Sequence, residues 1–208
     1  MALRIPPGRA GRLWLVARLE IAARGAALLD RKRQALLREQ QRLRAELREA
    51  QLAWNAAADD VDRWAARSAI VDGSGRRGLL ARHVHDRAEL ELSWSNLMGA
   101  RLPAVHRIEL PEPAPLSALG ASSATVLLER ACRQATLAAV RCAVLERAEA
   151  EISEELGRAV RRLRALEDRW IPQHQQALAQ LDLALDESQR EQAARVRWLT
   201  QRRDSLHP

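Results

Sequence analysis

A seven-residue repeat of apolar side chains constrains this sequence more than any other feature. From Leu15 to Trp64, apolar residues recur at alternating spacings of four and three positions. Seven residues fall short of two full α-helical turns, so such a seam stays buried only if the helix supercoils left-handed around a partner. Apart from the polar Arg33 and Gln40, the seam positions are Leu15, Leu19, Ala22, Ala26, Leu29, Leu36, Leu43, Leu47, Ala50, Trp54, Ala57, Val61 and Trp64.

A second seam of the same period runs from Leu128 to Trp170, with Glu149 as its polar position. Pro172 follows two residues after Trp170. Its missing N–H and its clash with the preceding turn predict a kink that costs about 3 kcal/mol. The two seams are predicted to pack on each other as antiparallel helices, with both termini at one end. The other members of the second seam are Ala131, Ala135, Ala138, Cys142, Leu145, Ile152, Leu156, Ala159, Leu163 and Leu166, and the spacing resumes at Leu178, Leu181 and Leu185.

Turn-forming and proline-rich segments divide the chain into three parts. Residues 1–72 are predicted to form the first long helix, which ends at the turn Asp72-Gly73-Ser74-Gly75. Residues 73–120 form a central insertion. Residues 121–208 form the second long helix, kinked near Pro172.

The insertion is predicted to begin with a short helix over residues 76–96, because apolar residues recur there at i, i+4 spacing. Prolines exclude a helix interior between residues 98 and 120, and the alternation over residues 105–110 suits one arm of a β-hairpin. The second long helix has a candidate N-cap at Ser122 or Ser123. Because it is longer than the first, its early turns are expected to pack against the short helix.

The predicted fold class is therefore all-α. It is a long antiparallel left-handed two-helix coiled coil with a small central insertion, which holds a short helix and a possible β-hairpin.

The charge of the chain admits two interpretations. The formal net charge is +7, and Lys32 is the one lysine among 34 lysine and arginine residues. Such a surplus suits a polyanion or an acidic protein partner. It is equally typical of solvated helix faces, since acidic residues are interleaved throughout. We favour the second interpretation.

No catalytic, cofactor or metal site is predicted. A P-loop needs Gly directly before its Lys, and Arg31 precedes Lys32. No Cys-x-x-Cys pair occurs. His83 and His85 would point about 200° apart on a helix, too far round to share an ion. No apolar stretch is long enough to predict direct membrane insertion.

The two polar residues of the first seam, Arg33 and Gln40, have two interpretations. Polar side chains at seam positions fix the register of paired helices at some cost in stability. They could equally mark the docking place of another protein in a larger assembly.

Three groups of motifs follow one another along nearly the whole chain. They are Pro7-x-Arg9, Arg18-Leu19 and Ala22-x-Arg24-Gly25-x-x-Leu28-Leu29-x-Arg31-Lys32-Arg33-x-Ala35-Leu36 near the start, Asn96-Leu97-Met98-Gly99-x-x-x-Pro103 in the middle, and Arg161-Arg162-Leu163-x-Ala165-Leu166-Glu167, Ile171-Pro172 and Leu185-Asp186-Glu187-x-x-Arg190-Glu191 near the end. In this order they resemble the D subunit of V-type and archaeal-bacterial A/V-type ATP synthases. Gly8, Gly11 and Arg12 depart from that pattern, in the first turns of the opening helix.

The resemblance implies a non-catalytic central rotor shaft that couples ion-driven rotation to ATP synthesis or hydrolysis. The implied partners are the A and B subunits of the catalytic ring, the small F subunit and the C-type connector of the membrane rotor, with no cofactor and no nucleic acid. The implied place is the cytoplasm of a bacterium, at the inner face of the cell membrane.

Candidate subunit-interface residues combine seam breaks, the kink and the matched motifs. They are Arg9, Leu13, Arg24, Lys32, Arg33, Gln40, Pro172, Asp186, Glu187 and Arg190. The alternative function is a free-standing basic coiled-coil protein that binds nucleic acid or organises chromosomes. A small helical enzyme is a third and more distant alternative.

Overall fold

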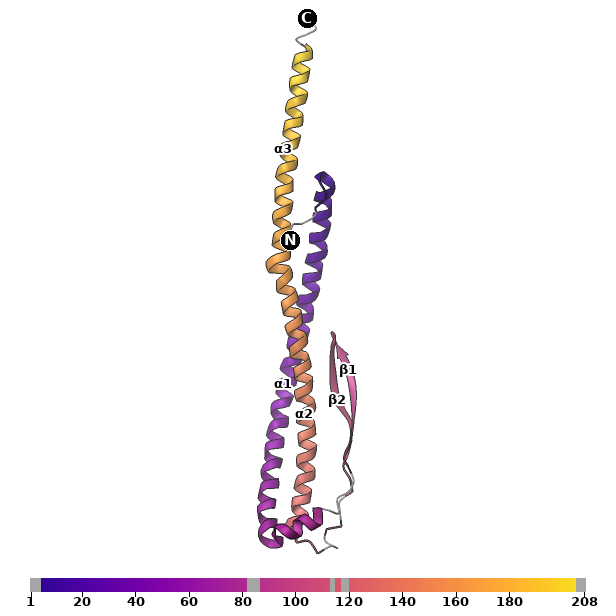
Figure 1. Ribbon diagram of the computed structural model, residues 1–208, viewed down its shortest axis with the longest axis vertical. Coiled ribbons are helices and arrows are strands. Elements are labelled where there is room, and N and C mark those ends of the chain that lie inside the picture. The colour runs from indigo at the N-terminus through magenta and orange to yellow at the C-terminus, as the bar shows by residue number, and fades with distance from the viewer. Residues whose placement is uncertain (1–4, 82–86, 113–114, 117–119, 205–208) are drawn as a thin grey trace. The chain divides into compact units, whose positions relative to one another are not determined.

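A computed structural model describes residues 5–81, 87–112, 115–116 and 120–204. The chain is mostly helical, with two long antiparallel helical arms and a β-hairpin between them (Figure 1). It divides into two compact units, residues 1–33 with 158–208 and residues 34–157. The elements are α1 (Gly8–Ala81), β1 (Glu89–Leu97), β2 (Ala100–Glu109), α2 (Ser123–Arg164), the π-helix η1 (Ala165–Trp170) and α3 (Ile171–Asp204).

In the unit of residues 34–157, α1 and α2 lie antiparallel along the predicted seams. Gln40 contacts Ser153, and Ser68 contacts Thr125, so residue numbers increase along α1 in the direction in which they decrease along α2. The seam positions of both helices are buried or half-buried, with one exception. Trp54 keeps 42% of its surface exposed. The heptad patterns therefore predicted the paired faces correctly at every other position.

The predicted end of the first helix is partly wrong. The backbone leaves helical geometry at Gly73, with φ 72° and ψ 162°, where the turn was predicted. Only glycine adopts such a conformation without strain. The helix then resumes and ends at Ala81.

The predicted short helix over residues 76–96 is wrong. Its first residues belong to α1, and residues 89–97 form β1. The i, i+4 spacing misled the prediction because residues four apart also share one face of a strand. The alternation of Leu90, Leu92 and Trp94 with Glu and Ser is the strand signal.

β1 and β2 form an antiparallel hairpin around a two-residue turn at Met98 and Gly99. Both turn residues have positive φ, 52° and 93°. This is the backbone that matches the twist of a hairpin, and glycine favours it. Asn96 fixes the turn, because its Oδ1 accepts the Gly99 N–H at 3.0 Å. The hairpin arm predicted over residues 105–110 is confirmed, and the strand starts five residues earlier than predicted.

The first turn of α2 packs on the end of α1 and not on a separate short helix, so that expectation is wrong. The Ser122 hydroxyl accepts the Thr125 N–H at 3.3 Å, which confirms the predicted N-cap. Asp72 of α1 accepts hydrogen bonds from the Ser122 and Thr125 hydroxyls, each at 2.5 Å. Buried Ser68 extends this cluster to the first helix, with its Oγ 2.5 Å from that of Thr125.

In the other unit, the first turns of α1 pair with α3. Leu15, Ala22 and Ala26 of α1 are buried, as their seam positions predict. Arg12 Nε lies 2.8 Å from Asp182 Oδ1, which ties the two helices together. Every described side chain from Asp186 to Arg203 is exposed. The extra length of the second arm therefore lies at its C-terminal end.

The disturbance predicted at Pro172 takes the form of a widened turn. Residues 165–170 form η1, and the Ile171 N–H donates to the Leu166 carbonyl five residues earlier. Pro172 has no N–H to donate and its ring crowds the preceding turn. A π-helical turn is one way in which a helix accommodates such an interruption.

Candidate functional site

A polar layer crosses the seam between α1 and α2 and is formed by Gln40, Arg44, Glu149 and Ser153. Gln40 is only 7% exposed, and its Nε2 donates to Ser153 Oγ at 2.6 Å and to Glu149 Oε1 at 3.1 Å. Ser153 Oγ and Arg44 Nε donate to the same carboxylate oxygen at 2.9 and 2.8 Å. Gln40 thus points into the pairing of the two helices, which favours the register interpretation over docking.

The carboxyl of Glu149 is the centre of this polar layer. Burial raises its pKa, but hydrogen bonds from Ser153, Arg44 and Gln40 outweigh burial and hold the pKa below its ordinary value. Glu149 is therefore ionised at neutral pH. The three donors give this carboxylate the hydrogen bonds that an apolar seam would not supply.

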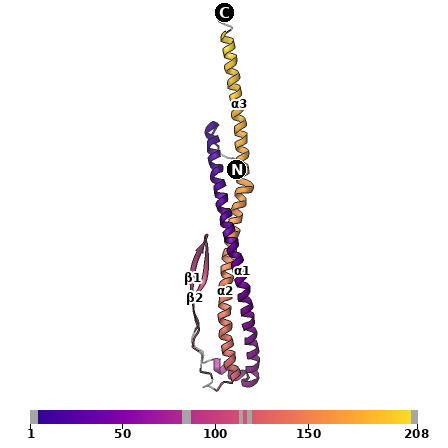
Figure 2. The same cartoon turned by 180° about the vertical axis from the view of Figure 1, so that it is seen from behind.

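The hairpin packs on the two helices next to this layer. Leu36 and Leu43 of α1, Ala148 and Ile152 of α2, and Ala100 and Leu102 of β2 form one buried cluster. In both views the hairpin runs beside the α1 and α2 segments of its own unit (Figure 1, Figure 2). The cluster explains how so small a sheet is held in place, since a lone hairpin is marginally stable in water.

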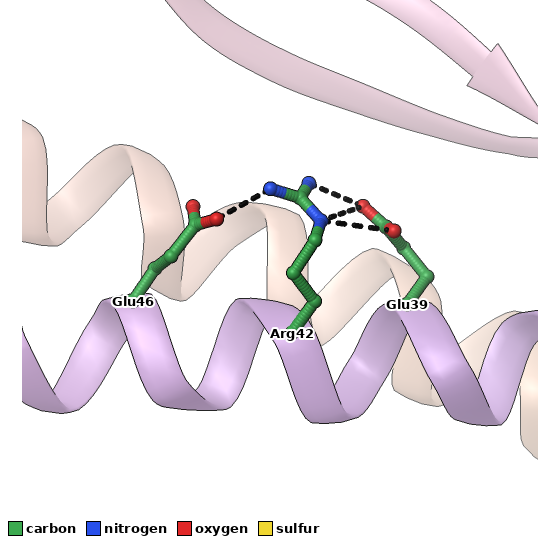
Figure 3. A network of polar contacts seen from close by, with 3 residues as sticks. All are labelled: Glu39, Arg42 and Glu46. Carbon is green, nitrogen blue, oxygen red and sulfur yellow. Dashed lines mark hydrogen bonds and ion pairs between the residues drawn. The ribbon is translucent and has the colours of Figure 1, made fainter.

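A groove of about 510 Å³ lies beside that cluster, between β2 and the helices. Its walls are mainly apolar and include Leu137, Val140 and Val144 of α2. The helix α1 contributes an ion network, in which Arg42 lies between Glu39 and Glu46, 2.5 Å from each (Figure 3).

The network beside the groove shifts the pKa of Glu39 and of Arg42. The hydrogen bond from Arg42 lowers the pKa of Glu39 against the opposing effect of burial. The same hydrogen bond raises the pKa of Arg42. The single guanidinium of Arg42 pairs with both carboxylates, and these contacts stabilise one face of α1 by the i, i+3 and i, i+4 geometry of helical pairs.

A second groove, of about 580 Å³, lies in the unit of residues 1–33 and 158–208. It brings together three predicted interface residues, Arg9, Leu13 and Asp186, beside the Arg12–Asp182 pair. Leu13 is 67% exposed, so an apolar side chain stands among charges of both signs. That mixture is typical of a surface that meets another protein.

The remaining predicted residues are not brought together. Arg24 donates to the Glu20 carbonyl at 3.4 Å, and Arg33 pairs with Asp30 at 2.6 Å. Glu187 and Arg190 pair loosely with each other at 3.6 Å on an exposed face. Lys32 is half-buried, and Pro172 is exposed behind η1. Each of these side chains lies on a helix surface without a shared site.

Sequence reasoning missed two features. The outer edge of β1 was assigned to a helix. Trp170 and His174 stack with ring centroids 3.6 Å apart, and His174 is 3% exposed. The i, i+4 spacing of two aromatic rings was the available signal for the stack.

Within residues 5–81, 87–112, 115–116 and 120–204, no three His, Cys, Asp or Glu side chains gather as metal ligands would. His83, His85 and Asp86 lie outside these residues. No helix among them is apolar enough over a sufficient length to span a bilayer.

Comparison with known families decides the identity of this architecture. The family model for the ATP synthase D subunit matches residues 13–201. The chain belongs to this family. The match covers both helical arms and the hairpin, so the D-subunit family accounts for the whole architecture and not for one motif of it.

Individual members of the family extend this likeness over nearly full length. The chain is 30% identical to the D subunit of the A-type ATP synthase of Pyrococcus horikoshii, over 94% of this chain and 92% of that protein. It is 28% identical to the D subunit of the V-type ATP synthase of Thermus thermophilus, over 93% and 86% of the two chains. It is 27% identical to the A-type D subunit of Pyrococcus furiosus, over 98% of each.

Family membership confirms the resemblance seen in the sequence. The protein is the D subunit of a V/A-type ATP synthase, which forms the central stalk of that rotary complex. The alternative of a free-standing nucleic-acid-binding coiled coil is not supported. Membership in a complex also implies that some exposed side chains of this D subunit are covered by other proteins of the complex.

Proposed function

We propose that this D subunit carries out no chemistry itself and transmits torque between the membrane rotor and the catalytic ring. The polar layer in the seam is the observation that carries this proposal. A shaft under torque must not let its two helices slide past each other. Gln40 bonds to Glu149 and Ser153 across the seam, so a slip of either helix would break these bonds and leave the half-buried Glu149 carboxylate without its donor from Gln40.

The proposed partners are the A and B subunits around the shaft, the small F subunit and the C-type connector of the membrane rotor. The groove with Arg9, Leu13 and Asp186 is the candidate surface toward the catalytic ring. Because its contacts involve charges near solvent, we expect binding there to weaken with salt. The proposed location is the cytoplasmic face of the membrane, as part of the complex.

Shape asymmetry is the second part of the proposed mechanism. A shaft that turns inside three catalytic sites must present each with a different profile to bias it between open and closed states. The widened turn η1, which Ile171 and Pro172 follow, interrupts the regular helix and supplies such an asymmetry. If Pro172→Ala removes the π-turn and leaves coupled ATP synthesis unchanged, the asymmetry has another source.

The decisive experiment is reconstitution with the other subunits of the same ATP synthase. The chain is expected to elute with the A and B subunits. A bead attached to the chain is expected to rotate when ATP is hydrolysed. Cys132 offers the attachment site because its thiol is exposed, while Cys142 is buried. A Cys132→Ala chain labelled in the same way is the control. Elution of the chain alone, together with retardation of DNA, would overturn the proposal.

A further inference from the structure

Among the described residues the hairpin is a sheet of two strands, so each strand has an edge without a described neighbouring strand. An unpaired edge presents backbone N–H and C=O groups that can pair with another chain. The two edges of this hairpin differ in sequence and in surroundings.

The edge of β2 is closed to another strand. β2 faces the helices, where Ala100 and Leu102 are buried and where five β2 residues line the groove. Pro103 lies in the middle of the strand and has no N–H. The register shift between Glu91 and Leu92 leaves His106 as an extra residue. Proline and bulges are devices by which proteins keep sheet edges from pairing.

The edge of β1 carries none of these devices. Its nine residues include no Pro, Lys or Arg, and all but Leu97 are exposed. Only Ser95 of β1 lines the groove. In the described part of the chain, backbone hydrogen bonds outside the regular elements lie between residues 116 and 126, so none of them reaches this edge.

The outward backbone groups of β1 follow from the register. In a hairpin closed by a two-residue turn, the pair next to the turn is hydrogen-bonded, and bonded and non-bonded pairs then alternate. Counting from Leu97 and Ala100, the N–H and C=O groups of Leu92, Trp94 and Asn96 point away from β2. Pro103 opposite Trp94 agrees with this count, because a residue without N–H suits a non-bonded pair.

The side chains of β1 indicate which residues a strand added at its outer edge would carry. Leu90, Leu92 and Trp94 form an apolar row on one face, 45%, 37% and 47% exposed. On the other face, no ion pair of the described residues engages Glu89 or Glu91, whereas Arg107 is paired with Glu109. A strand that alternates apolar residues with Lys or Arg would match both faces.

We propose that the outer edge of β1 receives an extended segment of another protein of the ATP synthase complex. The segment becomes the third strand of the sheet, with its apolar residues beside Leu92 and Trp94 and its basic residues opposite Glu89 and Glu91. This inference rests on the proposed function, because it takes the occupant from the same complex. Main-chain hydrogen bonds supply the affinity and the alternating side chains the specificity.

Residue-level hydrogen exchange tests the proposal on the wild-type chain, alone and in the assembled complex. The amides of Leu92, Trp94 and Asn96 are expected to exchange rapidly in the free chain and at least about a hundredfold more slowly after assembly. The amides of Ser93 and Ser95 are the internal control, since the hairpin itself protects them in both states. Unchanged exchange at the three outward amides in the assembled complex overturns the proposal. So does protection of the free chain that grows with its concentration, which would indicate pairing with a second copy.

A matched pair of variants separates backbone pairing from side-chain contact. Leu92→Pro removes one outward N–H without removing a bond of the hairpin, and Leu92→Thr keeps that N–H while shortening the side chain. In the assembled complex, Leu92→Pro is expected to lose the protection of Trp94, whereas Leu92→Thr retains it. Equal protection in both variants contradicts strand pairing. If the wild-type chain does not assemble at all, the proposed function fails, and not merely this inference.

Discussion

The two units of this chain hold similar helix pairs together in different ways. In residues 34–157, the seam is crossed by the polar layer at Gln40 and covered by a hairpin that completes a buried cluster. In residues 1–33 and 158–208, small residues such as Ala22 and Ala159 fill the seam, and η1 interrupts it. The comparison teaches that one coiled-coil repeat can encode a segment crossed by a hydrogen-bonded polar layer and a segment with an irregular profile.

The largest expected difference concerns packing. Ile152→Ala should lower the free energy of unfolding by about 4 kcal/mol, because Ile152 is fully buried in a cluster built by helices and hairpin that cannot collapse into the space. Leu15 is also fully buried but lies outside that cluster. Leu15→Ala should lower the free energy of unfolding by about 2–3 kcal/mol. Native-state hydrogen exchange, read separately for each unit, measures both. The control is Leu52→Ala, at a position 71% exposed, which should change little. Equal costs at the two buried positions would show that the hairpin adds no rigidity.

The polar layer should show the next largest effect. Gln40→Leu removes one of three donors to the Glu149 carboxylate and should cost about 1–2 kcal/mol. Replacing Gln40, Glu149 and Ser153 together, with Gln40→Leu, Glu149→Leu and Ser153→Ala, should be nearly neutral in stability, because the one charge that loses its partner, Arg44, is 55% exposed to solvent. Urea unfolding measures stability, and disulfide cross-linking between the helices measures register. If the triple variant also keeps a single register, the seam alone fixes it.

Low pH should lower the stability of the unit of residues 34–157 more than that of the other unit. Hydrogen bonds hold the folded-state pKa of Glu149, Glu39 and Asp72 below the ordinary values of 4.5, 4.5 and 3.8, and all three lie in residues 34–157. Their stabilisation is therefore full above the unfolded-state pKa and is lost as the pH falls through the lower folded-state pKa. The protection factors of this unit, which are the exchange rates corrected for the intrinsic effect of pH on amide exchange, should fall as the pH drops below about 4.5. In Glu149→Gln the same loss should be smaller. An identical acid profile for the variant and the wild type would exclude Glu149 as a source.

The smallest expected effect is that of the ion pair between Arg12 and Asp182. Both side chains are nearly half exposed, 49% and 40%, so solvent screens the pair. The coupling energy in a double-mutant cycle of Arg12→Ala and Asp182→Ala should stay below about 1 kcal/mol and vanish in high salt. A larger, salt-independent coupling would show that this unit too is locked across its seam.

The heptad pattern predicted the helical architecture well, because the pairing of the two helices depends on a single seven-residue repeat. Leu36, Leu43, Ile152 and their seam neighbours are buried as the heptads require. The N-cap at Ser122 and the break at Gly73 were also readable, since each depends on a few neighbouring residues. Residues 89–97 were mispredicted as helix, because a spacing of four fits a helix and a strand alike and the alternation of Leu90, Leu92 and Trp94 with polar residues was overlooked.

The candidate site was predicted only in part. Arg9, Leu13 and Asp186 do meet in one groove. Arg24, Glu187 and Arg190 were chosen from motifs, which say nothing about where a side chain lies on the surface. The edge of β1 could not be proposed while that segment was taken for a helix.

By itself, the sequence determined that two long helices pair along heptad seams, that the pairing is interrupted before Pro172, and that the motifs are those of the D-subunit family. Only the tertiary structure decided which polar seam residue has partners on the other helix, since Gln40 bonds across the seam whereas Arg33 pairs with Asp30 of its own helix. It also decided which strand edge is covered. Periodicity reports which face of an element is buried, whereas the partner that buries it is set by contacts between residues far apart in the chain.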